Sequence, residues 1–66
     1  MKNRLKVERA EHNLSQADLA DRIGVSRQTI NSIETGRYVP STILALKLAK
    51  VFSKAVEHIF TLEETD

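Results

Sequence analysis

The stretch LSQADLADRIGVSRQTINSIETG, residues 14–36, contains two helix starts separated by one short turn. The first start has Ser15 as its N-cap and Asp18 three residues later, which is an acidic variant of the capping box. Gly24 ends that helix, and Ser26 can cap the next helix only two residues further on. Two helices joined by so short a glycine-containing turn cannot lie antiparallel, so they must cross steeply, as in a helix-turn-helix.

Helical periodicity continues on both sides of this stretch, and no run of alternating β-branched residues is long enough for an extensive sheet. The expected helices cover about residues 4–12, 16–23, 27–35, a fourth helix that opens at Pro40-Ser41, and a short fifth helix over about 55–60. The fourth helix carries a broad apolar face that consists of Ile43, Leu44, Ala45, Leu48, Ala49, Val51 and Phe52. The sequence therefore predicts an all-α fold with five helices in one domain, residues 1–66.

The length and the composition of the chain limit its stability and its chemistry. A chain of 66 residues buries only about 60% of its unfolded surface, so it usually needs a cross-link, a metal or a partner. It has no cysteine, and His12 and His58 belong to no metal-ligand pattern, so we expect no disulfide, no metal and no cofactor. A homodimer is then the expected source of additional stability.

The chain lacks the apolar segments that direct proteins to membranes. Residues 1–12 do not form a signal peptide, and no segment approaches the roughly 20 apolar residues of a membrane span. Together with the absence of cysteine, this predicts a soluble protein of the cytoplasm.

The charges are distributed unevenly, although the net charge is only +1. Residues 1–54 contain all ten lysines and arginines against five acidic residues, whereas residues 55–66 contain four acidic residues and no basic one. The acidic tail, about residues 61–66, is therefore separable from the basic part and is a candidate for binding a basic protein partner.

The segment LSQADLADRIGVSRQTINSIETGRYVPS, residues 14–41, resembles the helix-turn-helix of the lambda-repressor-like family, also called the xenobiotic-response-element type of prokaryotic and phage regulators. The shared elements occur in order and at family spacing: Ser-Gln at the second helix, Gly-Val-Ser at the turn, Ile-x-x-Ile-Glu-x-Gly in the third helix, and Pro-Ser before the fourth. Short stand-alone regulators of the cytolysin-repressor type are the most similar members. In these, the chain ends can pair as two short strands, which here would join residues 1–4 to about 60–63.

The third helix has a polar outer face that is poor in charge. If Ile30 and Ile33 face the core, the opposite face points outward, because successive residues turn by about 100°. That face consists of Arg27, Gln28, Thr29, Asn31 and Ser32. Arginine can bridge guanine O6 and N7, glutamine or asparagine can bridge adenine N6 and N7, and a threonine methyl can contact a thymine methyl. The resemblance also implies that Arg27, Gln28, Asn31 and Ser32 face the bases, and a merely solvated polar face is the alternative.

Contacts to DNA phosphates are expected from residues around this helix. Gln16 lies in the first turn of the second helix, where free backbone N–H groups attract an anion and its side chain can add a donor. The resemblance implies that Arg37 and Tyr38 run along the DNA backbone, although Tyr38 can equally be an aromatic lid on the core. The helix-capping residues Ser26 and Ser41 complete the candidate set.

Other charged residues are expected to be structural or solvated. Arg9 follows Leu5 by one turn on the stripe that the first helix buries, and Glu34 follows Ile30 in the same way. We interpret Arg9 and Glu34 as an architectural ion pair, which the resemblance also implies, and exposed, uncoupled charges are the alternative. Lys47, Lys50 and Lys54 are expected to form a solvated face opposite the apolar side of the fourth helix.

These observations favour a regulator over an enzyme. An enzyme needs a nucleophile–base pair, a metal cluster or a phosphate loop, and the chain has none with usable spacing, so we expect no catalytic residue. The resemblance implies a transcriptional repressor of the nucleoid that reads a double-stranded DNA operator in the major groove, as a homodimer on an inverted repeat. We expect Ile59, Phe60 and Leu62 to form the dimer interface. An antitoxin or another protein-interaction module is the alternative, because a fold does not fix a function.

Overall fold

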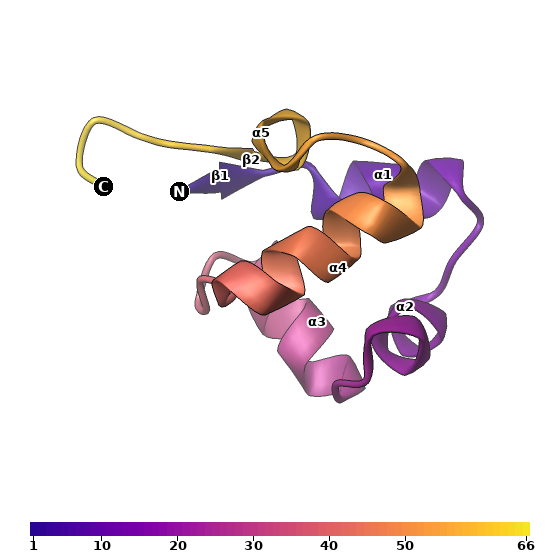
Figure 1. The fold of residues 1–66 in the computed structure, drawn as a ribbon. Coiled ribbons are helices and arrows are strands. Elements are labelled where there is room, and N and C mark those ends of the chain that lie inside the picture. The colour runs from indigo at the N-terminus through magenta and orange to yellow at the C-terminus, as the bar shows by residue number, and fades with distance from the viewer.

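The computed structural model describes residues 1–66 and contains five helices and two short strands (Figure 1). In chain order the elements are β1 (Lys2–Asn3), α1 (Leu5–Glu11), α2 (Gln16–Ile23), α3 (Arg27–Glu34), α4 (Thr42–Phe52), α5 (Val56–Ile59) and β2 (Phe60–Thr61). The predicted all-α class with five helices is confirmed, and the helix ends lie within one residue of the expected positions.

Serine side chains fix the start of three helices. Ser15, Ser26 and Ser41 each accept a hydrogen bond from the backbone N–H three residues later, at 3.0, 3.1 and 3.2 Å. At the first of these, the backbone N–H of Ser15 also donates to the Asp18 carboxylate at 3.0 Å, which completes the capping box. Ala55 occupies the same position before α5 and offers no side-chain cap, so the four-residue helix depends on packing.

The turn between α2 and α3 has the short, left-handed form that the sequence predicts. Gly24 has φ 73° and ends α2, and the N–H groups of Gly24 and Val25 both donate to the Ala20 carbonyl. Ser26 then starts α3 directly. The two helices cross steeply below α4 in Figure 1, so the helix-turn-helix geometry is set by residues within one short segment.

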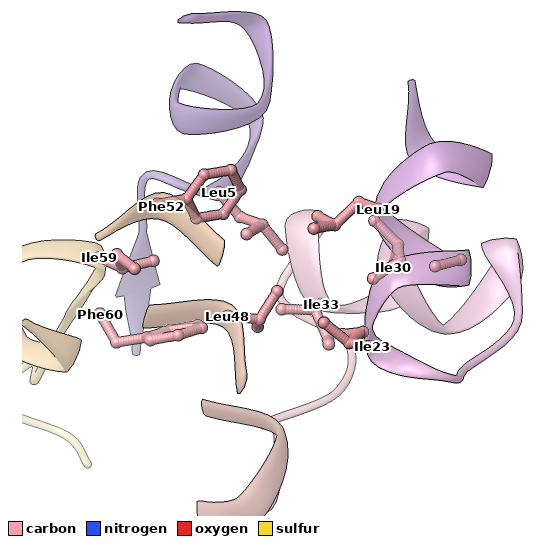
Figure 2. Packing of buried hydrophobic residues seen from close by; sticks show 10 residues of the cluster. Leu5, Leu19, Ile23, Ile30, Ile33, Leu48, Phe52, Ile59 and Phe60 are labelled. Carbon is pink, nitrogen blue, oxygen red and sulfur yellow. The ribbon is translucent and has the colours of Figure 1, made fainter. Parts of the chain in front are cut away.

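All five helices contribute to one hydrophobic core (Figure 2). The buried side chains are Leu5, Leu19, Ala20, Ile23, Ile30, Ile33, Leu48, Phe52, Ile59 and Phe60. One expectation is wrong, because Ile43 is 67% exposed. Leu44 and Leu48, four residues apart, face the core, whereas Ile43 and Leu46 lie on the exposed side of α4. This helix therefore buries one apolar face and leaves two further large apolar side chains exposed.

The two chain ends pair as an antiparallel two-stranded sheet, which lies beside α5 in Figure 1. Lys2 is opposite Thr61, and Asn3 is opposite Phe60. The Asn3 side chain also donates to the Ile33 carbonyl at 3.0 Å, so the sheet is tied to the end of α3. The predicted pairing of the termini is confirmed, over a shorter length than expected.

An ion pair that the local sequence pattern does not predict connects α1 with the segment that follows α4. Glu8 is completely buried, and its Oε2 atom lies 2.7 Å from Nζ of Lys54 and 3.7 Å from Nε of Arg4. The hydrogen bond from Lys54 lowers the pKa of Glu8 against the opposing effect of burial. The expectation that Lys54 is solvated like Lys50 is therefore wrong, because α4 ends before Lys54 and the chain turns it toward α1.

Replacing Lys54 by methionine tests this ion pair. Lys54→Met keeps much of the apolar length but leaves the buried Glu8 carboxylate with only Arg4 at 3.7 Å. We expect the midpoint of thermal unfolding at neutral pH to fall by about 5–15 °C. The control is Lys50→Met, because Lys50 is exposed and forms no ion pair, and its midpoint should change by less than about 3 °C.

The pH dependence of this difference gives a second measurement. A carboxylate with a lowered pKa stabilises the fold above its ordinary pKa of about 4.3, and the contribution is lost as the pH falls through the lower value of the folded state. The difference between the wild type and Lys54→Met should therefore narrow below about pH 4. A difference that stays constant between neutral and acidic pH would contradict the ion pair.

Candidate nucleic-acid interface

The polar face of α3 is oriented by two buried isoleucines. Ile30 and Ile33 lie in the core, and the opposite side of the helix presents Arg27, Gln28 and Asn31 to solvent. Thr29 and Ser32 are half-buried at the edges of this face. The structure therefore brings together the five side chains proposed to read bases: Arg27, Gln28, Thr29, Asn31 and Ser32.

These side chains differ in how much of their hydrogen-bonding capacity is free. Arg27, Gln28 and Ser32 form no side-chain hydrogen bond within the protein, whereas the hydroxyl of Thr29 lies 2.9 Å from the hydroxyl of Ser26. Ser26 also accepts the backbone N–H of Thr29. The Thr29 methyl group is therefore its free part, and Arg27 and Gln28 keep their full set of polar atoms.

A shallow hollow of about 500 Å³ lies beside this face, between α3 and the start of α4. Its lining consists of Val25, Ser26, Gln28, Thr29, Ser32, Tyr38 and Leu44. Tyr38 is 43% exposed, so it lies at the rim and does not close the core as a lid. We call the outward polar side of α3 the reading face, after the role proposed for it below, and the hollow along its edge has a mixed polar and apolar lining.

The segment after α3 is held to the helix by its backbone. The N–H groups of Arg37 and Tyr38 both donate to the Ser32 carbonyl, at 2.9 and 3.2 Å. Both side chains are exposed, and neither forms a hydrogen bond within the protein. Ser41 accepts the Leu44 N–H as a cap, so its hydroxyl hydrogen is still available. These groups lie next to the reading face on a fixed backbone.

A hydrogen-bonded network connects the interior of the protein with the reading face. Nε and one terminal nitrogen of Arg9 donate to the two carboxylate oxygens of Glu34, at 2.8 and 3.3 Å. The other terminal nitrogen donates to the Leu14 carbonyl at 2.9 Å. The Gln16 amide nitrogen then donates to Glu34 at 3.1 Å and to the Asn31 side-chain oxygen at 3.2 Å. The two core-facing charges of the sequence analysis therefore lie in contact and continue outward to α3.

This network changes what the Gln16 side chain can do. A primary amide has two N–H hydrogens, and those of Gln16 point to Glu34 and Asn31. The contact from this side chain to a phosphate stays a prediction, and it would require one of these two hydrogens to leave its present partner. The backbone N–H groups that have no intrahelical partner in the first turn of α2 are further donors at this helix start.

The residues expected to form a dimer interface are placed differently. Ile59 is completely buried and Phe60 is 6% exposed, so both belong to the core of the single chain, and only Leu62, at 78% exposure, is free. The sequence could not separate these cases, because an apolar residue packs equally well on its own chain or on a partner. Other large apolar side chains are exposed instead, and they include Val39, Ile43 and Leu46.

Two further structural features bear on function. The structure contains no cluster of three or more His, Cys, Asp or Glu side chains that can hold a metal ion. None of its helices combines the length and the apolar character that a membrane-crossing helix requires.

Comparison with known proteins gives matches over nearly the whole chain. Residues 5–59 match the family model described as helix-turn-helix. An uncharacterised HTH-type transcriptional regulator of Methanocaldococcus jannaschii is 56% identical over 66 residues, which is all of both chains. Proteins with the same description from Bacillus subtilis and Archaeoglobus fulgidus are 52% identical over 97% of both chains, and 46% identical over all of this chain and 93% of the relative.

Replacing Arg9 by alanine tests the inner end of the network. Glu34 has only 5% of its side chain exposed, so Arg9→Ala leaves a buried carboxylate without its main partner. We expect the free energy of unfolding to fall by about 3–5 kcal/mol, as it does when other buried ion pairs are broken. Thermal or denaturant melts measure it, with Lys6→Ala on the exposed side of α1 as the control.

A double replacement separates the ion pair from the packing around it. Arg9→Met with Glu34→Leu removes both charges and should recover much of the loss, because no buried charge then lacks a partner. If Arg9→Ala alone changes the free energy of unfolding by less than about 0.5 kcal/mol, as a surface substitution does, the ion pair contributes no stability.

Proposed function

Because this chain belongs to the helix-turn-helix family, and is a DNA-binding transcription regulator and not an enzyme, we propose that it represses transcription by binding a specific operator as a homodimer. The observation that carries the proposal is the exposed, polar face of α3, directly opposite the buried Ile30 and Ile33. In the proposed complex α3 lies in the major groove, and the protein acts at the nucleoid in the cytoplasm.

Base reading is proposed for the five side chains of the α3 face. Arg27 and Gln28 have all their donors and acceptors free, so each can form two hydrogen bonds to one base, Arg27 to guanine and Gln28 to adenine. The Thr29 methyl group can contact a thymine methyl, because its hydroxyl is held by Ser26. Asn31 and Ser32 add shorter polar groups further along the helix.

Phosphate binding is proposed for the groups on either side of α3. The backbone N–H groups at Gln16 precede the reading face, and Arg37 and Tyr38 follow it. Ser26 and Ser41 lie at the starts of α3 and α4, where backbone N–H groups also attract anions. Contacts on both sides of a groove-bound helix fix its register without reading sequence.

The dimer interface is proposed on the outer apolar surface, defined as Val39, Ile43, Leu46 and Leu62. These large apolar side chains are 58–78% exposed in the single chain, and a partner that covers them would remove apolar surface from water. Val39 and Leu46 also line a groove of about 250 Å³ whose other residues are mostly apolar and include Val56 and Phe60. A second copy of the chain is the partner proposed here, because two-fold symmetry then generates an inverted repeat.

The interaction-module alternative loses its main support. It depends on an acidic tail that is free to bind a basic protein, but the amino group of Met1 lies 2.9 Å from carboxylate oxygens of both Glu63 and Asp66. Only Glu64 of the three acidic residues in the tail is then unpaired. An antitoxin function is therefore the alternative that applies if the DNA-binding test shows no sequence preference.

Replacing Gln28 and Arg37 separates base reading from phosphate binding. On an operator selected from random DNA, Gln28→Ala should weaken binding by about 1–3 kcal/mol per half-site and remove the preference at one base pair. Arg37→Ala should weaken binding to all sequences and reduce the slope of log K against log salt by about 1 per phosphate contact, or about 2 per dimer. Fluorescence anisotropy on the operator, single-base variants and random duplex at several salt concentrations measures both effects.

Two outcomes would contradict this assignment. If Gln28→Ala leaves the base preference unchanged, α3 does not read the operator through this residue. If the wild type binds operator and random DNA equally, the chain is not a sequence-specific regulator, and the protein-interaction alternative takes precedence.

Introducing a charge into the outer apolar surface tests the dimer. We expect the wild type to sediment as a dimer at micromolar concentration and Leu46→Glu to sediment as a monomer, because a carboxylate cannot be buried there without a partner. The control is Val7→Glu, which changes an exposed valine of α1 that lies outside the outer apolar surface. On DNA, the wild type should require two half-sites whose centres lie about 34 Å apart, or a multiple of that distance. A wild type that is monomeric and binds a single half-site with full affinity refutes the dimer.

A further inference from the structure

A chain of hydrogen bonds runs from Arg9 through Glu34 and Gln16 to Asn31, and the donor and the acceptor of each bond are fixed. Arg9 can only donate, because a guanidinium has no acceptor. The Glu34 carboxylate that receives its hydrogen bonds can only accept. The Gln16 side chain therefore turns its amide nitrogen, and not its oxygen, toward Glu34. The orientation of this amide is thus decided by the buried ion pair.

The orientation of the Gln16 amide also fixes the orientation of the Asn31 amide. The nitrogen that Gln16 directs to Glu34 also lies 3.2 Å from Asn31, so Asn31 must present its carbonyl oxygen to Gln16. Its amide nitrogen then points away from Gln16 and forms no hydrogen bond within the protein, although the residue is exposed on the reading face. Asn31 consequently turns its oxygen toward Gln16 and its two N–H donors away from it.

An asparagine that directs only its donors to the base does not read the same base as a free asparagine. A free asparagine pairs with adenine by accepting from N6 and donating to N7. With its oxygen turned toward Gln16, Asn31 directs N–H donors and not its acceptor to a base, and the N6 amino group of adenine is itself a donor. Guanine presents two acceptors, O6 and N7, on the same edge, and cytosine presents only a donor there. We propose that Asn31 reads guanine in the operator and that Gln16 is the positioning residue that imposes this choice.

The proposal rests on the proposed function, since it assumes that α3 lies in the major groove. It adds a specific base to a residue whose type alone suggests adenine. It also gives Gln16 a role in specificity that is independent of any phosphate contact.

Base preference at one position tests the proposal. The position that Asn31 reads is the base pair at which Asn31→Ala, bound to single-base variants of the operator, shows equal affinities. There the wild type should prefer guanine to adenine by about tenfold, and 7-deazaguanine, which lacks the N7 acceptor, should weaken wild-type binding by about fivefold or more.

Two substitutions of Gln16 separate positioning from structure. Gln16→Met has a similar shape but no donor, so it frees the Asn31 oxygen, and the guanine-to-adenine ratio should fall by about tenfold. Gln16→Lys has only donors, so it should retain the guanine preference. Each ratio compares two affinities of one protein preparation, so partial unfolding of a variant cancels.

The possible failures are distinguishable. A wild type that prefers adenine at this position, or a ratio that Gln16→Met leaves unchanged, overturns the role of Gln16 while the proposed function stands. The same holds if Asn31→Ala alters no base preference on an operator that the wild type binds specifically. If the wild type binds no DNA sequence in preference to another, the proposed function fails and this inference fails with it.

Discussion

The buried contact between Arg9 and Glu34 constrains the orientation of the reading face of α3. One guanidinium joins three parts of the chain, since Arg9 lies on α1, Leu14 lies between α1 and α2, and Glu34 ends the helical part of α3. Its donors have fixed directions in a plane, so the angle of α3 cannot change without breaking hydrogen bonds in a partly buried setting. The direction in which the polar face of α3 points is therefore set inside the protein, before any DNA is bound.

Hydrogen bonds within the protein also determine which polar atoms remain free on the surface of α3. A list of residue types on α3 suggests that all five polar side chains read bases through complete sets of donors and acceptors. In the structure, the hydroxyl of Thr29 is held by Ser26, and the oxygen of Asn31 is held by Gln16. Arg27 and Gln28 alone combine exposure with an unoccupied two-point hydrogen-bonding edge. In the proposed complex, the base specificity of this surface therefore depends on these internal hydrogen bonds as well as on residue identity.

The sequence predicted the features that depend on short-range chemistry. The serine caps, the left-handed Gly24 and the steep crossing of α2 and α3 involve residues only a few positions apart, so their types and spacing are sufficient. Glu8 and Lys54 are 46 residues apart, and their pairing depends on where the chain turns after α4, which no local pattern encodes. Ile59 and Phe60 show another limit, because an apolar helix face is the same whether it is covered by its own chain or by a partner. Glu8 could have been found, since it lies three residues after the buried Leu5 on the stripe that also carries Arg9.

In the proposed dimer, the exposed apolar side chains of α4 connect the association of two chains with DNA binding. Leu44 and Leu48 pack on the core side of this helix, whereas Ile43 and Leu46 leave more than half of their surface exposed. In the proposed dimer these side chains are buried, and Val39, in the segment that carries Arg37 and Tyr38, is buried with them. Association would then bring the two phosphate-binding segments toward the two-fold axis and hold them at one separation. The apparent stability of the fold and the apparent affinity for an inverted repeat would both rise with protein concentration, because dimerisation supports both.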